Sequence, residues 1–362
     1  MPAVFYARNV TDDEVSSAPR RVTIEEVARS LGVSNGAVSF ALNDRPGVSD
    51  ETRKRILERA QEMGWRPRVR RRREGERVGV IGFALERKAP NLAVESFYAQ
   101  FVAGVESEIS KRSYGLLWQI VSTLDAELEL YRRWQRLGTV DGVMLVDIRQ
   151  DDPRIGYFSR AGALPSIVVA DRAVAGGLTS ISVDDGGAMR ELILQLHELG
   201  HRSVLRVSGP AESVFTRLRD RAMVETAAEC GITARIERSD LTARSGALLT
   251  RAALTTPGRP TAIVYENDLM ALAGQGVAAE LGIRVPEELS IIAWDDSPLC
   301  AVAWPPISAM SRDVLALGAQ TARHLLGTIE GAEPAAYADA RPRLKMRGTT
   351  APAPRTTFLR PG

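Results

Sequence analysis

Short apolar runs alternate with amphipathic helical stretches from Val78 to about residue 347, and this alternation limits the possible folds more than any other feature of the sequence. Such alternation is typical of parallel sheets that are covered by helices on both faces. About ten strands divide better into two sheets than into one. The expected strands include Val78–Phe83, Leu116–Val121, Gly142–Val146, Ser166–Ala170, Ser203–Val207, Ala262–Tyr265 and Leu289–Trp294. The helices expected between them lie near 97–112, 125–137, 187–199, 214–230, 243–254, 268–281 and 313–330.

The chain of 362 residues is too long for one compact core, since cores stop growing near ~250–300 residues. We therefore predict an α/β protein with a two-lobed, doubly wound domain behind a small helical head. The expected boundaries are 1–20 for a disordered extension, 21–67 for the head, 68–77 for an Arg-rich linker, 78–347 for the large domain (lobe 1 about 78–183 and 311–335, lobe 2 about 184–310 and 336–347) and 348–362 for a flexible tail.

The charge of the chain is unevenly distributed. The formal net charge is only +2, but residues 20–73 contain 14 Lys and Arg against 7 Asp and Glu, which leaves the remainder at −5. A basic end on a mildly acidic body indicates that this end meets a polyanion such as nucleic acid.

Residues 21–67 read as three short helices. Thr23 and Glu26 have the spacing of a capping box, and Gly32 supplies the left-handed residue that ends the first helix. Ser34 is expected to cap a second helix and Ser49 a third, which runs from about Asp50 to Met63. The residues expected to face inward are Ile24, Val27, Ala28, Leu31, Ala37, Val38, Ala41, Leu42, Val48, Ile56, Leu57 and Ala60. Two short helices joined by a turn that contains Gly-Val match the helix-turn-helix plan.

The whole segment VTIEEVARSLGVSNGAVSFALNDRPGVSDETRKRILERAQEMGWRP closely resembles the DNA-binding head of the lactose-repressor (LacI/GalR) family of bacterial transcription regulators. The resemblance implies that the second helix enters the major groove of DNA. It places Asn35, Gly36 and Phe40 at base-reading positions, where Asn can pair with adenine and Phe can contact a thymine methyl. The positions that approach phosphates are Ser34, Ala37, Ser39, Asn43, Ser49, Thr52 and Arg53.

After Pro67 the chain departs from the family. The family has a short hinge helix that places an apolar side chain in the minor groove, whereas this chain has Arg70, Arg71, Arg72 and Arg73, followed by Glu74 at the wedge position. The arginines suit a narrow minor groove, where the negative potential is enhanced. A solvated basic linker that adds only nonspecific affinity is an equally good interpretation.

Polar side chains follow several of the expected strands in the large domain. Asp147, Asp171, Asn267 and Asp295 each come directly after a strand, where ligands of doubly wound folds bind. Together with the aromatic residues Phe97, Tyr98 and Trp294, they indicate a saccharide pocket, because carboxylates bind hydroxyl pairs and flat rings cover the apolar faces of sugars. Helix capping is the alternative role; we favour it for Asp185 and Asp268, and Asp147 is open to either role.

The family resemblance continues through LHELGHRSV, SGP, RLRDRAM, TAIVYENDLMALA, GIRVPEELSIIAWDDSP and PPISAMSRD. By motif alignment it implies that Asp171, Arg217, Asn267 and Asp295 hold the hydroxyls of an effector and that Phe97 is the aromatic residue after the first strand. Arg217 would offer a rigid fork of donors. The resemblance does not identify the sugar.

Several enzymatic interpretations fail. His197-Glu198-Leu199-Gly200-His201 satisfies the letters of a zinc-protease signature, but Gly200 stops the helix that would align both imidazoles. Paired Asp295 and Asp296 point in different directions, so they do not flank one glycosidic bond. We expect no catalytic residue, no metal and no cofactor.

The sequence therefore predicts a transcription regulator, expected to be a repressor, which binds palindromic double-stranded operator DNA and responds to a small-molecule effector, expected to be a sugar. Two heads are needed to read a palindrome, so we expect a homodimer or a dimer of dimers. Two cysteines and the lack of a long apolar run or secretory signal favour a cytoplasmic, nucleoid-associated protein without membrane contact. A sugar-binding receptor of the transport type is the alternative.

Overall fold

The computed structural model describes residues 22–42, 47–64, 77–87 and 96–354 of the chain. The chain forms two compact units, Met1–Arg73 and Glu74–Gly362. Among the described helices, none combines the length and the apolar character that crossing a membrane requires.

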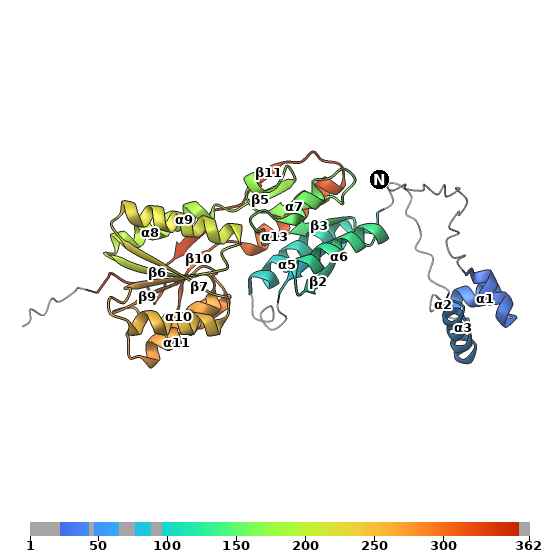
Figure 1. Ribbon diagram of the computed structural model, residues 1–362, viewed down its shortest axis with the longest axis horizontal. Coiled ribbons are helices and arrows are strands. Elements are labelled where there is room, and N and C mark those ends of the chain that lie inside the picture. Colours follow the sequence, from blue (N-terminus) through green and yellow to red (C-terminus); the bar gives the residue numbers. More distant parts are fainter. Residues whose placement is uncertain (1–21, 43–46, 65–76, 88–95, 355–362) are drawn as a thin grey trace, which may run out of the picture. The chain divides into compact units, whose positions relative to one another are not determined.

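The first unit contains three helices, α1 (Ile24–Leu31), α2 (Asn35–Leu42) and α3 (Asp50–Glu62), drawn in blue in Figure 1. The predicted capping box is present, since the Thr23 hydroxyl accepts from the amide of Glu26 while the Glu26 carboxylate accepts from the amide of Thr23. Gly32 ends α1 in the left-handed conformation at a φ of 66°. Ser34 and Ser49 accept hydrogen bonds from the first turns of α2 and α3.

The core of this unit consists of Val27, Ala28, Val38, Ala41, Ile56 and Ala60, all of which were predicted to face inward. Leu57 was also predicted to face inward, and this prediction is wrong, because its side chain is 44% exposed. Its neighbour Ile56 is fully buried, and successive helical residues point about 100° apart.

The second unit has two six-stranded sheets. The first sheet has the order β11-β5-β4-β3-β1-β2, and all its strands are parallel. The second has the order β12-β10-β9-β8-β6-β7 and is parallel except for β12. The strands are β1 (Val80–Glu86), β2 (Gly115–Val121), β3 (Gly142–Leu145), β4 (Ser166–Val169), β5 (Thr179–Ser182), β6 (Ser203–Ser208), β7 (Thr233–Arg238), β8 (Ala262–Tyr265), β9 (Ser290–Ala293), β10 (Ser308–Ser311), β11 (Ala336–Ala338) and β12 (Arg343–Lys345).

Helices cover both faces of each sheet, as the alternating pattern predicts. In the first lobe α5 and α13 pack on one face and α6 and α7 on the other. In the second lobe the two faces are covered by α8 with α9 and by α10 with α11 (Figure 1). These helices, with the short α12, are α5 (Ser96–Ile109), α6 (Leu124–Leu137), α7 (Pro153–Phe158), α8 (Asp185–Glu198), α9 (Val214–Glu229), α10 (Ala243–Thr255), α11 (Asp268–Glu280), α12 (Pro298–Val302) and α13 (Val314–Ile329).

The chain crosses between the lobes three times, after β5, after β10 and after β11. The last crossing corrects one predicted boundary. Residues 336–347 were all assigned to the second lobe, but β11 pairs with β5 in the sheet of the first lobe and only β12 lies in the second. β11 is a short, exposed edge strand, so its sequence carries no burial pattern to reveal its sheet.

The predicted flexible tail from residue 348 is also partly wrong. Thr349 is fully buried, and its hydroxyl accepts from the amide of Ser308 at 2.9 Å and donates to the carbonyl of Ile291 at 2.7 Å. The amide of Ala353 donates to the carbonyl of Leu199 at 2.8 Å. A Pro- and Thr-rich sequence gives no sign of backbone partners of this kind. Of the predicted tail, only residues 355–362 lie outside the described chain.

Two glycines allow α5 and α13 to pack in direct backbone contact. A Cβ atom on Gly104 would lie 2.1 Å from the carbonyl oxygen of Leu315, and one on Gly318 would lie 2.2 Å from the carbonyl oxygen of Phe101. Since both obstacles are backbone atoms, no side-chain movement relieves the clash.

Replacement of Gly104 by alanine therefore tests how tightly this helix pair is packed. We expect Gly104→Ala to lower the free energy of unfolding by about 1–3 kcal/mol, despite the higher helix propensity of alanine. Gly156→Ala in α7 is the control, because no atom lies within 4 Å of the added methyl group. Chemical denaturation of both variants measures the effect, and equal stabilities would contradict the close packing.

Candidate functional site

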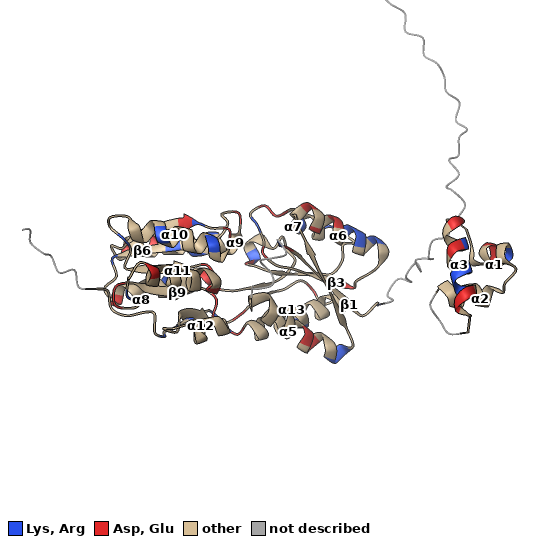
Figure 2. Cartoon of the chain, turned by 90° about the horizontal axis from the view of Figure 1, so that it is seen from below, with Lys and Arg blue, Asp and Glu red and all other residues tan. Residues whose placement is uncertain are grey.

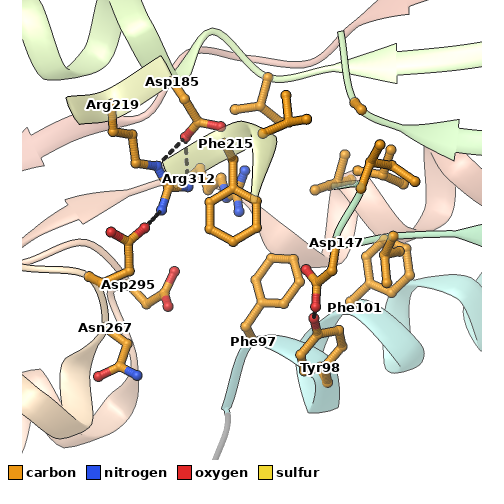
Figure 3. A pocket seen from close by; sticks show the side chains of 18 of the residues that line it. Phe97, Tyr98, Phe101, Asp147, Asp185, Phe215, Arg219, Asn267, Asp295 and Arg312 are labelled. Atoms are coloured by element: carbon orange, nitrogen blue, oxygen red, sulfur yellow. Dashed lines mark hydrogen bonds and ion pairs between the residues drawn. The ribbon is translucent and has the colours of Figure 1, made fainter. Parts of the chain in front are cut away.

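A cavity of about 140 Å³ lies between the two lobes, at the carboxyl ends of strands from both sheets. This volume is similar to the ~150 Å³ cavity that holds a benzene ring, so it has room for one six-membered ring. Its walls include Phe97, Asp147, Asp171, Asn267 and Asp295. The structure thus brings five of the seven predicted effector residues together in one cavity. Figure 3 labels four of them, Phe97, Asp147, Asn267 and Asp295.

Arg219 provides the floor of the cavity on the side of the second lobe. Its guanidinium donates to Asp185 at 2.7 Å and also to Glu266, and only 5% of the residue is exposed. The guanidinium carbon of Arg219 lies 4.7 Å from the centroid of the Phe215 ring and 4.3 Å from the centroid of the Trp294 ring. The charge is thus held by two carboxylates and two aromatic rings, of which Figure 3 shows Asp185 and Phe215 beside Arg219.

Two predicted residues do not line the cavity. Arg217 is exposed on the surface of α9, whereas Phe215, Leu218 and Arg219 face inward from the same helix. The alignment of RLRDR therefore chose the wrong arginine, because residues three and four positions from Phe215 share its face and the residue two positions away does not. Trp294 lies beneath Arg219, only 2% exposed, and supports the floor instead of touching the cavity.

Asp147 lies on the opposite wall. Its carboxylate accepts from the Arg87 guanidinium. It also accepts from the hydroxyl of Tyr98 (Figure 3). Burial disfavours the charged form, but the charge of Arg87 and the hydrogen bond from Tyr98 outweigh it, so the pKa of Asp147 lies below its usual value. The backbone of Asp147 has a φ of 50°, a left-handed conformation that Asp tolerates better than most residues. Asp147 is therefore a charged wall residue and not a helix cap.

Two of the predicted residues line the cavity and cap helices at the same time. Asn267 accepts from the amide of Met270 at the start of α11, and Asp171 accepts from the amide of Ala173 at the start of a short 3₁₀ helix, Arg172–Val174. The favoured capping roles of Asp185 and Asp268 are wrong, because Asp184 and Asn267 are the N-cap residues of α8 and α11. Asp185 instead pairs with Arg219, and Asp268 lines the cavity.

Aromatic side chains from α5 form a third wall. The ring of Phe97 stacks on Phe101 with centroids 6.0 Å apart, and the guanidinium carbon of Arg312 lies 5.1 Å from the centroid of the Phe97 ring. Sequence reasoning missed Arg312, Arg87 and Glu266, although each directly follows a strand. Position at a strand end was therefore the available signal, and the search for acceptor side chains overlooked the two arginines.

Carboxylates outnumber guanidinium groups around the cavity. Six carboxylates line it, from Asp147, Asp171, Asp185, Glu266, Asp268 and Asp295, against three guanidinium groups, from Arg87, Arg219 and Arg312. Burial raises the pKa of Asp295 to about 7; Arg312 and Arg219 oppose this shift, and Asp268 and Glu266 add to it. The site therefore offers many hydrogen-bond acceptors and disfavours anions.

In the helical unit, Ser34, Asn35, Gly36, Phe40 and Ser49 are exposed. The residues Ala37, Ser39, Thr52 and Arg53 are half-buried, whereas Asn43 and Arg70–Arg73 lie outside the described residues. Phe40 covers Gly47, whose added Cβ atom would lie 3.2 Å from the ring.

The charge of the folded helices is nearly balanced. Acidic and basic side chains both occur along α3 (Figure 2), and six of the 14 basic residues in 20–73 lie between Arg66 and Arg73. The positive charge of this end therefore comes mainly from the segment after the helices.

His201, the second histidine of the sequence that resembles a zinc site, has a structural role. His201 is fully buried, with one ring nitrogen 2.9 Å from the hydroxyl of Thr261 and the other 3.2 Å from the carbonyl oxygen of Ala351. Among the described residues, no group of three or more His, Cys, Asp or Glu side chains could hold a metal ion.

The raised pKa of Asp295 predicts how stability depends on pH. Between pH 5 and 7 the carboxyl group of Asp295 keeps its proton in the folded state but has released it in the unfolded state, where its ordinary pKa is 3.8. The free energy of unfolding therefore falls as the pH rises through this range. We expect wild type to lose up to about 3 kcal/mol more stability than Asp295→Asn between pH 5 and 8. Urea denaturation across this range measures the difference. If the free energies of unfolding of wild type and Asp295→Asn change in parallel with pH, the raised pKa of Asp295 is contradicted.

The chain is similar to known proteins along most of its length. Residues 23–68 match the model of bacterial regulatory proteins of the lacI family, and residues 193–350 match a periplasmic binding protein-like domain. The transcriptional regulator MalR of Streptomyces coelicolor is 32% identical over 343 residues, which cover 91% of this chain and 97% of MalR.

Two solved structures are similar over most of the chain. A complex of the regulator CelR with cellobiose is 27% identical, with a TM-score of 0.69, and covers 91% of this chain and 100% of its own. A lac repressor dimer bound to operator and the anti-inducer ONPF is 25% identical, with a TM-score of 0.68, and covers 92% of this chain and 100% of its own. With a helix-turn-helix unit, a two-lobed unit and relatives along nearly its whole length, this chain belongs to the LacI family of bacterial transcription regulators.

Proposed function

We propose that this regulator is a repressor that binds a palindromic operator as a homodimer or a dimer of dimers, and that a neutral sugar in the interlobe cavity controls its binding. The observation that carries the proposal is one cavity with polar walls from both lobes, in the same chain as a helix-turn-helix unit. A ligand that touches both lobes favours one arrangement of the lobes over another, which is the requirement for a switch. Operator binding places the protein in the cytoplasm, on the nucleoid.

The exposed start of α2 supports a role in base reading. Asn35 is the first residue of this helix and presents an amide that can pair bidentately with adenine. Gly36 permits close approach to the DNA, and Phe40 offers an apolar edge to a thymine methyl. The residues proposed to contact phosphates are Ser34, Ala37, Ser39, Asn43, Ser49, Thr52 and Arg53. Arg70–Arg73, which follow them in the sequence, add further positive charge.

The chemistry of the cavity supports a neutral, polyhydroxylated ligand. Asp147, Asp171, Asn267 and Asp295 present acceptors for hydroxyl groups, and Phe97 presents a flat apolar face. Arg219 is already matched by two carboxylates, so a phosphate would meet more negative than free positive charge. The complex of CelR with cellobiose supports the same class of ligand.

An exposed apolar patch supports dimerisation. Trp304 is 91% exposed and Val302 is 78% exposed, and Leu299 and Leu272 are also exposed nearby on α12 and α11. Apolar patches of this kind mark interaction sites, and a second copy of this chain is the proposed occupant because a palindrome needs two heads. The dimer of the lac repressor on its operator is consistent with this arrangement.

Replacement of Asn35 tests operator reading. We expect Asn35→Ala to weaken binding to the operator by about 5–150-fold, the equivalent of 1–3 kcal/mol for one base-reading contact, with little change in binding to random DNA. Fluorescence anisotropy on the DNA upstream of its own gene, with and without a panel of sugars, measures both affinities. Equal binding to that DNA and to random DNA, with every sugar, would reject the proposed function.

The charge-bearing substitution Trp304→Asp tests the dimer surface. We expect it to produce monomers, because two copies of a buried aspartate would replace an apolar contact. Val224→Asp is the matched control, since Val224 is 52% exposed on α9, which covers the other face of the same sheet. Analytical ultracentrifugation gives the mass of each variant. If Trp304→Asp still forms a dimer, this surface is not the dimer interface.

A further inference from the structure

Two helices of the first lobe end at the edge of its sheet where the strands begin. The strands β1, β3 and β4 are parallel, so α6 before β3 and α7 before β4 both return to this edge. The carboxylate of Asp141, in the loop after α6, accepts from the amides of Val78 and Gly79 at 3.0 and 2.7 Å. This loop therefore lies beside the point where the chain from the helix-turn-helix unit arrives.

Four exposed arginines gather at the ends of these two helices. Arg132, Arg133 and Arg136 lie in the second half of α6, and Arg160 lies two residues after α7. Figure 2 shows the change of charge along α6, from acidic residues in its first half to basic residues at its end. Glu129 pairs with Arg132, which leaves the charges of the other three arginines.

The loop that carries Arg160 is held against the end of α6. The hydroxyl of Tyr157 donates to Oε1 of Gln135 at 2.5 Å, and Nε2 of Gln135 donates to the carbonyl of Gly162 at 2.8 Å. Because Gln135 is the neighbour of Arg136 in the sequence, these bonds bring the loop to the end of the helix. Arg133, Arg136 and Arg160 thus form one surface, which we call the arginine surface.

The charges of the arginine surface are not matched by carboxylates. In the part of the chain that the structure describes, the side chains of Arg133, Arg136 and Arg160 make no ion pair or hydrogen bond. Arg112, at the same edge of the sheet, pairs with Glu330. The negative end of the α6 dipole favours a cation in the last turn, such as Arg136, but this effect fades before Arg133. Three unmatched guanidinium groups on one surface favour an anionic partner.

We propose that the arginine surface binds backbone phosphates of the DNA that flanks the operator. This proposal rests on the proposed function and adds a second contact with the same DNA molecule. DNA is the polyanion that this chain is proposed to meet, and the 12 residues 65–76 between the helix-turn-helix unit and Arg77 span at most about 40 Å. The planar guanidinium fork matches a phosphate group, and such contacts read no bases. The surface therefore lengthens the DNA site without adding to the sequence that is read.

The test is fluorescence anisotropy with the full-length protein and two fragments of the DNA upstream of its own gene. The short fragment carries only the operator, which is delimited by the base substitutions that weaken binding. The long fragment adds about 15 bp of random sequence on each side, or about 50 Å, which exceeds the reach of residues 65–76. We expect the long fragment to bind at least about tenfold more tightly, with a salt dependence that is steeper by about 0.9 for each added phosphate contact.

A triple variant locates the contact on the arginine surface. We expect Arg133→Gln/Arg136→Gln/Arg160→Gln to lose the advantage of the long fragment and the added salt dependence. Its affinity for the short fragment should stay within about twofold of wild type, because exposed charges beyond a Debye length are screened. All three side chains are exposed, so the substitutions carry little risk to folding.

The matched control removes the same charge from the second lobe. It is Arg217→Gln/Arg244→Gln/Arg343→Gln, which replaces exposed arginines without an ion pair among the described residues, and it should keep the advantage of the long fragment. No advantage in wild type, an advantage that persists in the first triple variant, or its equal loss in both would overturn the flanking contact and leave the proposed function intact. If neither fragment binds more tightly than random DNA of its own length, with and without sugar, the proposed function fails as well.

Discussion

The buried charge of Arg219 determines how the floor of the cavity is built. A guanidinium group taken from water is stable only with matched carboxylates, and here they come from the start of α8 and the end of β8. Glu266 also pairs with Arg206, which is fully buried and bonds to Asp220. One carboxylate thus serves two buried arginines, and loss of any member would leave a charge without compensation. The network holds the strand ends and α9 in fixed positions, so the second lobe presents a rigid surface to a ligand.

The first lobe presents a different surface to the same space. It contributes the aromatic residues of α5 and the ion pair between Arg87 and Asp147, while three chain crossings and the contact between residues 148–150 and 212–214 connect the lobes. A ligand between two rigid surfaces with few connections acts on their relative arrangement more than on either fold. A change in the arrangement of the lobes is thus the means by which an effector bound in the second unit can change operator binding by the first, through the chain that joins the two units.

The sequence predicts the architecture well because periodicity and caps are local. The capping box of Thr23, the left-handed Gly32 and the alternation of strands and helices are all present in the structure. The cavity was predictable in part, since Phe97, Asp147, Asp171, Asn267 and Asp295 all follow strands or start helices at one edge. Their role in binding remains a proposal.

The errors arise where neighbours in space decide the outcome. The choice between Arg217 and Arg219 depends on the rotation of α9, the burial of Trp294 depends on the arginine above it, and the position of β11 depends on pairing with a distant strand. Likewise, Thr349 is buried because Ile291 and Ser308 supply partners. None of these facts has a signature within a few residues of the position concerned.

The most direct test of the account is a measurement of thermodynamic linkage between the cavity and the operator. The affinity for operator DNA is measured with and without saturating sugar, and the affinity for the sugar with and without saturating operator. If the ligand controls DNA binding, both affinities change by the same factor, of about 5–150-fold for typical allosteric coupling. A factor of one in both titrations, with sugar and operator each bound, would contradict the claim that the cavity regulates the helix-turn-helix unit.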